Sequence, residues 1–488
     1  MALVVVRQLF LGKIVRCSFE GGDKKVLNQI EYYRDAFVGN RFLEFINKAE
    51  YIVGYGEAEI QNKNPKAYYS APLTHLWAMM ERGLDIFSSI LGYDGTLVSL
   101  DIDYYNSKSP GEIYFDSDNV FKNKIEPIRE IVKSVYRDFG ISYLEVITGC
   151  GYHYHSLWPF NNEHWQLEKI GCLEYTLEQQ YIDRRSQDGR NPIPVYKGFG
   201  HSGAFRLLQF ISLEIMERAS CLREKNKKII QIEFCDIEVP SPGCVSIDLT
   251  TYSDPLYMRV LRVPFSTHQK HKVKKHEIGE DISNLVPIQT ILPTSDMSID
   301  NLLKMRRNFR WSSDYARDPK SSCIIPNSSK GWLNVLSKYK NSELHQFHTK
   351  FDSIDYEKEN DWSTTYYALN LNELLPCVKH SIVIPEPHIK KPTNIRKIVA
   401  VLRSKGWDYK HIAGFFYSHF KKLIDFSSNK YNAEIRANFF VQLYGAPIYL
   451  GIDKLLDINC ISHSEIGYCI KSLCGHDLAL WKPNDCKD

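Results

Sequence analysis

The chain has 488 residues, of which 43% are hydrophobic and 24% are charged, and its formal net charge at pH 7 is +3. This composition excludes a wholly disordered chain, and so small a net charge does not by itself indicate nucleic-acid binding. The 12 cysteines include no Cys-x-x-Cys pair and are too sparse for a disulfide scaffold, and no apolar run approaches the ~18 residues of a membrane helix. We therefore expect an intracellular, soluble protein that is cytoplasmic, nucleoid-associated or, in a eukaryote, nuclear.

Strand-like and helix-like segments alternate over residues 1–285, which indicates an α/β or α+β domain, and we expect the α+β class. Residues 1–12 have the pattern of a first β-strand and lack the basic start of a signal peptide. Further strands are expected over residues 97–103, 143–148, 244–251 and 257–263. Helices are expected over residues 122–140, with Gly140 at the end, and over residues 203–219.

The rest of the chain divides at proline-bearing breaks. Residues 286–393 show no strong periodicity and predict an irregular connecting region, with 382–394 as its clearest linker segment. Residues 394–488 predict a helical C-terminal domain whose second helix begins after Asp408 as its N-cap.

Two carboxylates stand at the end of the predicted strand 97–103. Asp101 and Asp103 would share one face of that strand, where they repel each other unless a cation lies between them. Oxygen ligands favour Mg²⁺ or Mn²⁺, although a solvated strand end is the simpler interpretation of an isolated Asp-x-Asp motif. A second such motif, Asp116 and Asp118, lies in a turn-like polar stretch, and we interpret it as solvated surface.

A small-residue turn follows the predicted strand 143–148. Thr148, Gly149, Cys150 and Gly151 could bring backbone amides close to a phosphate. His153 and His155 come next, on a resumed strand and on the same face as each other. This segment alone leaves two interpretations open, a surface strand with two histidines or a metal-binding His-hydrophobic-His pair.

A third segment combines an acidic strand with a basic run. Ser246, Asp248 and Thr250 would share one strand face, and six Lys or Arg without an acid follow between Arg259 and His276. Such a cluster suits a triphosphate or a nucleic-acid backbone, whereas a charge run is more often a solvated face. Apolar residues and a Pro-Phe-Ser turn interrupt the run, which favours a built site.

Together these segments resemble the motifs of the archaeo-eukaryotic primase superfamily, which comprises primase small subunits and primase-polymerases. The family's strand ending in Asp-x-Asp/Glu is similar to residues 101–103, and its small-residue turn ending in histidine is similar to residues 151–153. Its third carboxylate resembles Asp248, and its hydrophobic-hydrophobic-(Lys/Arg)-x-Pro-x-Ser-x-His motif, the most specific one, resembles residues 261–268. The resemblance covers about residues 90–275.

The resemblance implies an RRM-like sheet flanked by helices as the catalytic core. It implies that Asp101, Asp103 and Asp248 are catalytic and bind two Mg²⁺ or Mn²⁺ ions. It also implies a nucleotide-binding set: Thr148, Gly149, Gly151, His153, Arg262, Ser266 and His268. Two features depart from the family, since the turn lacks the basic residue of several relatives and no zinc knuckle lies between the second and third motifs.

The expected activity is that of a template-directed nucleotidyltransferase, a DNA primase or primase-polymerase. It would make or extend primers on single-stranded DNA from NTPs or dNTPs, with a helicase or another replication protein as a possible partner. The alternative is an HUH-type single-strand DNA endonuclease that uses His153 and His155 with a nucleophilic tyrosine, which leaves Asp248 and residues 262–268 unexplained. A non-catalytic module is disfavoured because all three carboxylates are present.

The C-terminal region contains a set of possible Zn²⁺ ligands: Cys460, His463, Cys469, Cys474, His476 and Cys486. The same stretch is amphipathic, so buried cysteines on a helix are the simpler interpretation.

This region also predicts a basic surface. An apolar stripe is formed by Ile395, Ile398, Val399 and Leu402. Basic residues that fall mostly outside the stripe or follow it are Arg396, Lys397, Arg403, Lys405, Lys410, His411, Lys421 and Lys422. We expect these residues to bind template or primer DNA, the alternative being a packing domain whose lysines maintain solubility.

Overall fold

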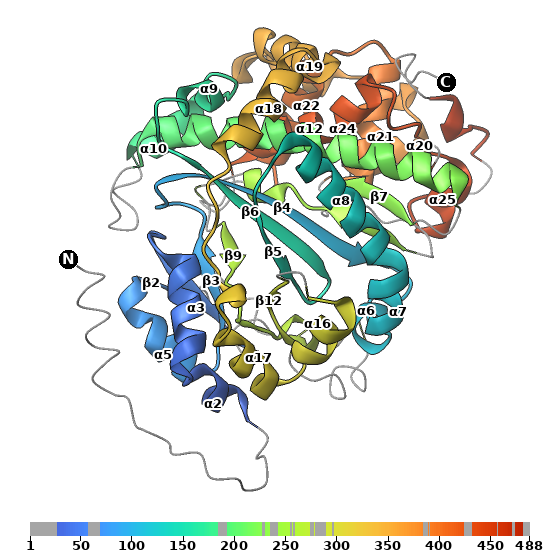
Figure 1. The fold of residues 1–488 in the computed structure, drawn as a ribbon. Coiled ribbons are helices and arrows are strands. Elements are labelled where there is room, and N and C mark those ends of the chain that lie inside the picture. The colour runs from blue at the N-terminus through green and yellow to red at the C-terminus, as the bar shows by residue number, and fades with distance from the viewer. Residues whose placement is uncertain are drawn as a thin grey trace, which may run out of the picture.

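The computed structural model describes most of the chain. The described residues are 27–56, 69–183, 193–226, 230–234, 243–253, 256, 259–273, 278, 289–294, 297–383, 389, 391–423, 432–455, 457–470 and 474–481. The strand predicted over residues 1–12 lies outside them. The fold is α+β, as the sequence predicts (Figure 1).

The longest strand, β4 (Gly95–Tyr105), lies inside a six-stranded sheet of order β12-β5-β6-β4-β8-β7. Val98, Leu100 and Ile102 are buried, as the predicted alternation requires. Neighbouring strands are antiparallel except for β7 and β8, which are parallel. The other strands are β5 (Leu144–Ile147), β6 (Gly151–Pro159), β7 (Gln231–Phe234), β8 (Cys244–Ile247) and β12 (Leu292–Pro293). The strands predicted at 97–103, 143–148 and 244–251 are thereby confirmed, with β8 shorter than predicted.

Long helices cover one face of this sheet: α8 (Glu126–Phe139), α12 (Val195–Lys225) and α18 (Ser329–Lys340). The Arg129 guanidinium of α8 lies 4.7 Å from the Tyr152 ring centroid, and Trp332 Nε1 of α18 donates to Ser156 Oγ (2.8 Å). Both predicted helices are confirmed, and α8 ends at Gly140, whose φ of 70° is accessible to glycine without a steric penalty.

The N-terminal part forms a four-stranded antiparallel sheet of order β2-β1-β3-β9, which we call the small sheet. Its strands are β1 (Ile52–Tyr55), β2 (Tyr69–Ala71), β3 (Asp85–Ser89) and β9 (Val260–Arg262). The strand predicted at 257–263 therefore joins a different sheet from the one that carries Asp101. Adjacent elements are α2 (Gln29–Tyr33), α3 (Ala36–Ile46), α5 (Leu76–Glu81), η2 (Leu73–His75), and the two-stranded pair β10 (Thr267–His268) and β11 (Gln289–Thr290).

The connecting region predicted to be irregular is largely helical over residues 299–383. Its helices are α16 (Ile299–Met305), α17 (Phe309–Ala316), α18, α19 (Glu343–Ser353) and α20 (Pro376–Val383), with short 3-10 turns η5 (Pro319–Ser321), η6 (Glu359–Asp361), η7 (Tyr366–Ala368) and η8 (Leu371–Glu373). The second Asp-x-Asp motif is also helical rather than turn-like, because Asp118 lies in α7 and Asp116 precedes it. Short helices elsewhere are α6 (Glu112–Phe115), α7 (Ser117–Val120), η3 (Phe121–Ile125), α9 (Trp165–Glu168), α10 (Tyr175–Asp183), η4 (Thr250–Tyr252) and α13 (Lys270–Val273).

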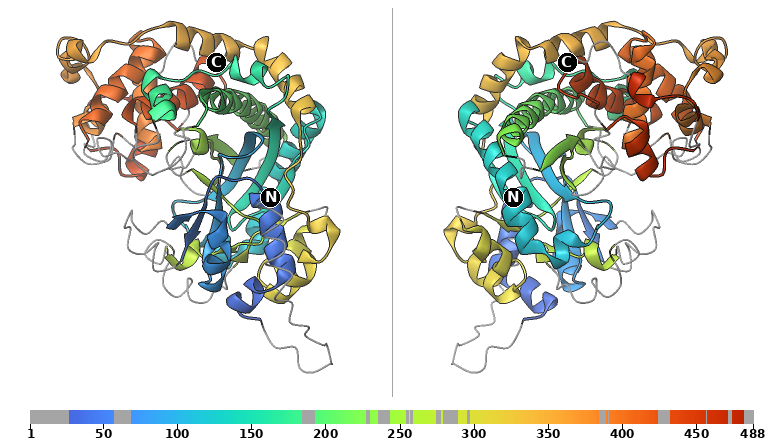
Figure 2. Two further views of the ribbon diagram at one scale, coloured as in Figure 1. Left: turned by 90° about the vertical axis from the view of Figure 1, so that its left-hand side faces the viewer. Right: turned by 90° about the vertical axis from the view of Figure 1, so that its right-hand side faces the viewer.

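The C-terminal region is helical, as predicted. Its helices are α21 (Pro392–Ser404), α22 (Tyr409–Lys421), α24 (Ala433–Tyr449), α25 (Cys460–Glu465) and η10 (Leu478–Leu480), and Asp408 occupies the N-cap position of α22. These helices pack against α12, since Gln209 Nε2 of α12 donates to the carbonyl oxygen of Gln442 in α24 (3.0 Å). Figure 2 shows them and the small sheet at opposite ends of the molecule, with the six-stranded sheet between. Within the described residues, we find no helix of the length and apolar character that crossing a membrane requires.

Candidate active site

The three predicted carboxylates and His153 occupy adjacent positions on the six-stranded sheet. Asp101 of β4 lies directly opposite His153 of β6. On the other side of β4, the backbone N–H of Asp248 donates to the carbonyl oxygen of Asp101 (2.9 Å). Asp103 lies two residues along β4, on the same face as Asp101. We call these four residues the acidic row.

His153 is electrostatically coupled to the row. Its Nε2 atom lies 3.2 Å from Asp101 Oδ1, an ion-pair contact. Burial disfavours the charged imidazole, but the negative charge of Asp101, together with that of Asp103, outweighs burial and raises the pKa of His153 above its ordinary value. His153 therefore partly neutralises the carboxylates beside it.

Asp103 is held in an unfavourable environment for a carboxylate. Burial and the neighbouring charge of Asp101 raise its pKa to about 6, although Lys270, His153 and a hydrogen bond from Thr148 act in the opposite direction. The Thr148 hydroxyl donates to Asp103 Oδ1 (3.3 Å). Two like charges on one strand face thus lack full compensation from the protein itself.

The carboxylate oxygens of the acidic row are suitable ligands for a divalent cation. Asp101 Oδ1 is buried and already contacts His153 Nε2 (3.2 Å), so a cation bound at this oxygen would share it with the imidazole. Carboxylate oxygens are the donors that Mg²⁺ and Mn²⁺ prefer. Across the described ranges, however, no three His, Cys, Asp or Glu side chains are already positioned to hold one ion together.

The turn 148–151 uses most of its polar groups internally. The Thr148 hydroxyl accepts hydrogen bonds from the N–H groups of Cys150 (3.1 Å) and Gly151 (2.8 Å). These two amides are therefore already paired, contrary to a cradle in which all amides of the turn face a phosphate. A Cβ on Gly151 would lie 1.8 Å from the Ile102 carbonyl oxygen, so the glycine is required by strand pairing.

His268 packs on this turn. A Cβ on Gly149 would lie 2.5 Å from His268 Cε1, and the Tyr114 ring centroid is 6.2 Å from that of His268. Burial, followed by the charges of Arg262 and Lys270, lowers the pKa of His268 well below its usual range, so the imidazole is neutral. Its Nδ1 atom is buried and has no hydrogen-bond partner within the described residues.

Replacing Gly149 by Ala is expected to displace the His268 ring, because a methyl group cannot occupy the same space. Overpacking of this kind costs about 1–3 kcal/mol of unfolding free energy. Chemical denaturation of the wild type, Gly149→Ala, His268→Ala and the double variant measures it. The penalty should largely disappear when His268 is already Ala, and an equal cost in both backgrounds would contradict the contact.

Arg262 and Ser266 lie in a buried network of the small sheet. Arg262 Nη1 pairs with Asp85 (2.5 Å) and donates to the Thr267 carbonyl oxygen (2.9 Å). Ser266 Oγ accepts a hydrogen bond from the Ile86 N–H (2.7 Å). The structure thus gives both residues partners within the protein and places them at the junction of β3 and β9.

Sequence reasoning missed two charged residues near this site. Asp85 is buried beneath Arg262, and its place at the start of a strand gave no functional signal. Arg306 is fully buried and donates to the carbonyl oxygen of Thr148 (2.6 Å) and to Ser117 Oγ (2.5 Å), both neutral groups. Burial, with the charge of Arg307, lowers its pKa to about 9, so Arg306 stays cationic at neutral pH directly behind the turn.

The chain matches no protein-family model, no curated protein and no solved structure. Its resemblance to the primase superfamily therefore rests on the three motifs and their order.

The two histidines of the second motif have different environments. His155 is fully buried, and its Nδ1 atom lies 2.8 Å from Ser99 Oγ while its ring packs edge-on against Phe45. Burial and His153 lower the pKa of His155 well below its ordinary value. An HUH nuclease needs both imidazoles at one exposed metal, so the core position of His155 disfavours that alternative.

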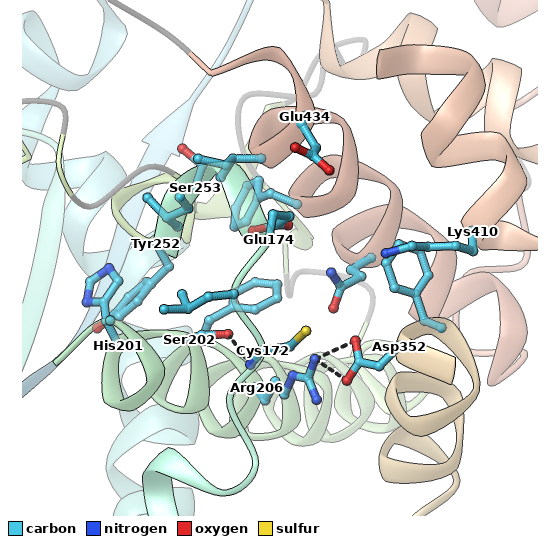
Figure 3. Close-up of a pocket in the computed structure, with 18 of the residues that line it drawn as sticks. Cys172, Glu174, His201, Ser202, Arg206, Tyr252, Ser253, Asp352, Lys410 and Glu434 are labelled. Carbon is cyan, nitrogen blue, oxygen red and sulfur yellow. Dashed lines mark hydrogen bonds and ion pairs between the residues drawn. The ribbon is translucent and has the colours of Figure 1, made fainter. Parts of the chain in front are cut away.

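A cavity of about 450 Å³ lies between α12, the end of α19 and α24 (Figure 3). Arg206 Nη2 contacts both carboxylate oxygens of Asp352 (2.8 and 2.7 Å) at one side of it, and Glu174 and Glu434 line another part. Tyr252 also lines the cavity, and its hydroxyl accepts a hydrogen bond from the Ser99 N–H on β4 (2.8 Å). The cavity is thus linked to the strand that carries Asp101.

The Glu174 carboxyl makes stability depend on pH. Burial and the charge of Glu434 raise its pKa to about 7. A carboxyl whose folded pKa is raised retains its proton in the folded state, so the unfolding free energy should fall by about 2 kcal/mol as pH rises from about 4.5 to 7. Denaturation at several pH values should show that Glu174→Gln makes the slope shallower by this amount, while Asp103 and Glu233, whose pKa values are also raised, keep their own shares of it. The exposed control Glu163→Gln should keep it, and an unchanged slope in Glu174→Gln would contradict the assignment.

The basic C-terminal residues do not form the continuous surface predicted. Arg396 and Lys397 are buried, because α21 packs on all sides, and they cannot contact DNA in this arrangement. Exposed members of the predicted set are Lys405, Lys421 and Lys422. Lys421 pairs with Glu359 (2.5 Å), which reduces the net positive charge there.

Proposed function

We propose that this chain is a metal-dependent, template-directed nucleotidyltransferase that makes or extends primers on single-stranded DNA. The observation that supports it is the acidic row, in which the two carboxylates of the Asp-x-Asp motif on β4 lie beside Asp248, the residue that directly follows β8. The proposal includes a catalytic core of the archaeo-eukaryotic primase type, with an RRM-like sheet flanked by helices.

Asp101, Asp103 and Asp248 would hold Mg²⁺ or Mn²⁺. Bound in pairs, these ions activate the primer 3′-hydroxyl and neutralise the triphosphate in phosphoryl transfer. The Thr148 hydroxyl orients Asp103, and His153 balances part of the charge of Asp101. Thr148 and His153 thus restrain two of the carboxylates, and metal binding would draw the three together.

The positive charges around the turn 148–151 suit a triphosphate. The positive charge of Lys270 acts on Asp103, and Arg306 lies behind the turn, where it donates to two neutral groups, the Thr148 carbonyl oxygen and Ser117 Oγ. In this proposal Arg262 and Ser266 support the site by fixing the backbone that leads to His268, because both are engaged with β3. A direct contact of Arg262 with nucleotide would require exchange of its Asp85 partner.

Primer synthesis on a single-stranded template tests the proposal. Labelled NTPs and dNTPs are supplied separately, each with Mg²⁺ and with Mn²⁺, and the products are resolved on a denaturing gel. We expect nucleotide-dependent, metal-dependent products and no covalent protein–DNA adduct. Nicking of the template without nucleotide, with a tyrosine-linked adduct, would instead establish the HUH alternative. Absence of both products under all four conditions would refute the proposal.

A further inference from the structure

Cysteine and histidine side chains of the C-terminal region surround one small cavity. It is lined by Cys460, His463, Cys469 and Cys474, together with Cys377 of α20. Its volume of about 20 Å³ is enough for a single water-sized particle. The four cysteines have intermediate exposure and are not joined in disulfides, so the cavity gathers reduced sulfur atoms.

His463 has the arrangement of a metal-binding imidazole. The side chain is 1% exposed, and its Nδ1 atom donates to the carbonyl oxygen of Asn459 (3.1 Å). This hydrogen bond leaves the lone pair on Nε2, which is buried and has no hydrogen-bond partner within the described residues.

The sulfur atoms of Cys460 and Cys474 both contact the carbonyl oxygen of the same residue, His476. Cys460 Sγ is 3.7 Å and Cys474 Sγ is 3.8 Å from the carbonyl oxygen of His476. Cys460 Sγ also accepts a hydrogen bond from the Leu478 N–H (3.3 Å), an interaction that stabilises a thiolate. The fold therefore brings two distant cysteines to one point and provides a donor for the charge of one of them.

A buried cation adjoins the thiols. Lys397 is fully buried, and its Nζ atom donates to two neutral groups, the Cys377 carbonyl oxygen (3.3 Å) and Ser381 Oγ (3.1 Å). Neither of these two acceptors carries a negative charge. Burial lowers the pKa of Lys397 to about 8, and negative charge on Cys377 or Cys469 acts in the opposite direction. Thiolates at this cavity would therefore supply the negative charge that balances the Lys397 ammonium.

We propose that Cys460, His463, Cys469 and Cys474 bind one Zn²⁺ ion. Three sulfur donors and one imidazole nitrogen are the tetrahedral donor set of structural zinc, and the spacing Cys-x2-His-x5-Cys-x4-Cys is as short as in small zinc modules. Three thiolates and Zn²⁺ carry one net negative charge, which the Lys397 ammonium balances. In the metal-free arrangement the side chains surround the cavity without meeting at one point, so binding draws them inward.

The zinc site would link the C-terminal helix α25 to α20. It joins α25, Cys469 and Cys474 to the cavity wall formed by α20, and Figure 1 shows α20 and α25 near each other. Because zinc binds the folded arrangement and not the unfolded one, its binding free energy adds to the stability of this region.

Metal analysis of the full chain tests the proposal. After purification with zinc and gel filtration, elemental analysis should find one Zn²⁺ per chain. Cys469→Ser, Cys474→Ser and His463→Ala should each lower zinc affinity at least about a hundredfold. Cys377→Ser, in the same cavity, and Cys172→Ser, on the surface, should retain one zinc. His463→Cys should restore binding, which a purely structural histidine would not allow.

Cobalt provides a second measurement that does not depend on variants. Co²⁺ added to the metal-stripped wild-type chain should give the visible spectrum of a tetrahedral thiolate site, and Zn²⁺ should abolish that spectrum and raise the melting temperature. A chain without zinc and without this spectrum would overturn the proposal, as would wild-type affinity in Cys469→Ser and Cys474→Ser. Loss of zinc in Cys377→Ser with retention in His463→Ala would overturn His463 as a ligand.

Discussion

Replacing Asp103 by Asn is expected to abolish nucleotide incorporation while making the metal-free protein more stable. The variant removes one oxygen charge that would hold a divalent cation, and loss of several kcal/mol of charge stabilisation corresponds to a decrease of at least about a thousandfold in rate. It also removes the repulsion between Asp103 and Asp101, which should raise the unfolding free energy by about 1–3 kcal/mol. Primer extension and thermal melting without metal measure the two effects.

The opposite signs of these effects distinguish a ligand from a structural residue. A carboxylate that only supported the fold would lose activity and stability together. The control is Asp118→Asn, which changes an exposed carboxylate of α7 and should leave both measurements unchanged. Extension at the wild-type rate by the double variant Asp101→Asn/Asp103→Asn would refute the catalytic assignment of the acidic row.

Local sequence pattern was sufficient to predict the strand that carries this row. Apolar residues at positions 98, 100 and 102 alternate with polar ones, and a strand with one buried face requires that period. The same pattern places Asp101 and Asp103 on one face whatever the rest of the fold. Their position beside Asp248 followed only from the order of the motifs, because cross-strand pairing is not encoded in either strand alone.

Local pattern failed where both faces of an element are buried. The stripe of apolar residues in α21 predicts that Arg396 and Lys397 face solvent, yet residues 393–402 are all buried. The charges are tolerated because Arg396 meets two aspartates more than 50 positions away, and Lys397 lies beside the thiols of the small cavity. The helical periodicity of a sequence cannot predict such distant partners.

The supporting residues of the candidate site were missed for the same reason. Asp85 is 177 positions from Arg262, and Arg306 is 158 positions from Thr148. Arg306 stands in a basic segment with Lys304 and Arg307, Asp85 follows Arg82 by three residues, and charged side chains of this kind are ordinarily solvated. Only the folded chain shows that one is paired and that the other stands behind the turn.

Replacing Arg396 by Met is expected to destabilise the protein by about 3–5 kcal/mol, the usual cost of removing one partner from a buried ion pair. Arg396 Nε and Nη2 donate to Asp453 (2.6 and 2.5 Å), and Nη1 donates to Asp457 (2.5 Å). Glu233 is a further neighbour, whose pKa burial raises to about 7 while Arg396 acts in the opposite direction. Without the guanidinium these acids would be left together in a buried region. Denaturant unfolding measures the loss.

Two variants decide whether Arg396 stabilises the fold or binds DNA. Lys405→Met, at the exposed end of the same helix, removes an equal charge and should change stability by no more than about 0.5 kcal/mol. The triple variant Arg396→Met/Asp453→Asn/Asp457→Asn should recover part of the lost stability, because it removes the charges that Arg396 balances. A role in template binding predicts the reverse pattern, in which Arg396→Met weakens affinity for single-stranded DNA at unchanged stability and the added Asn substitutions recover nothing. The burial of the guanidinium and its three short contacts with carboxylates favour the structural outcome.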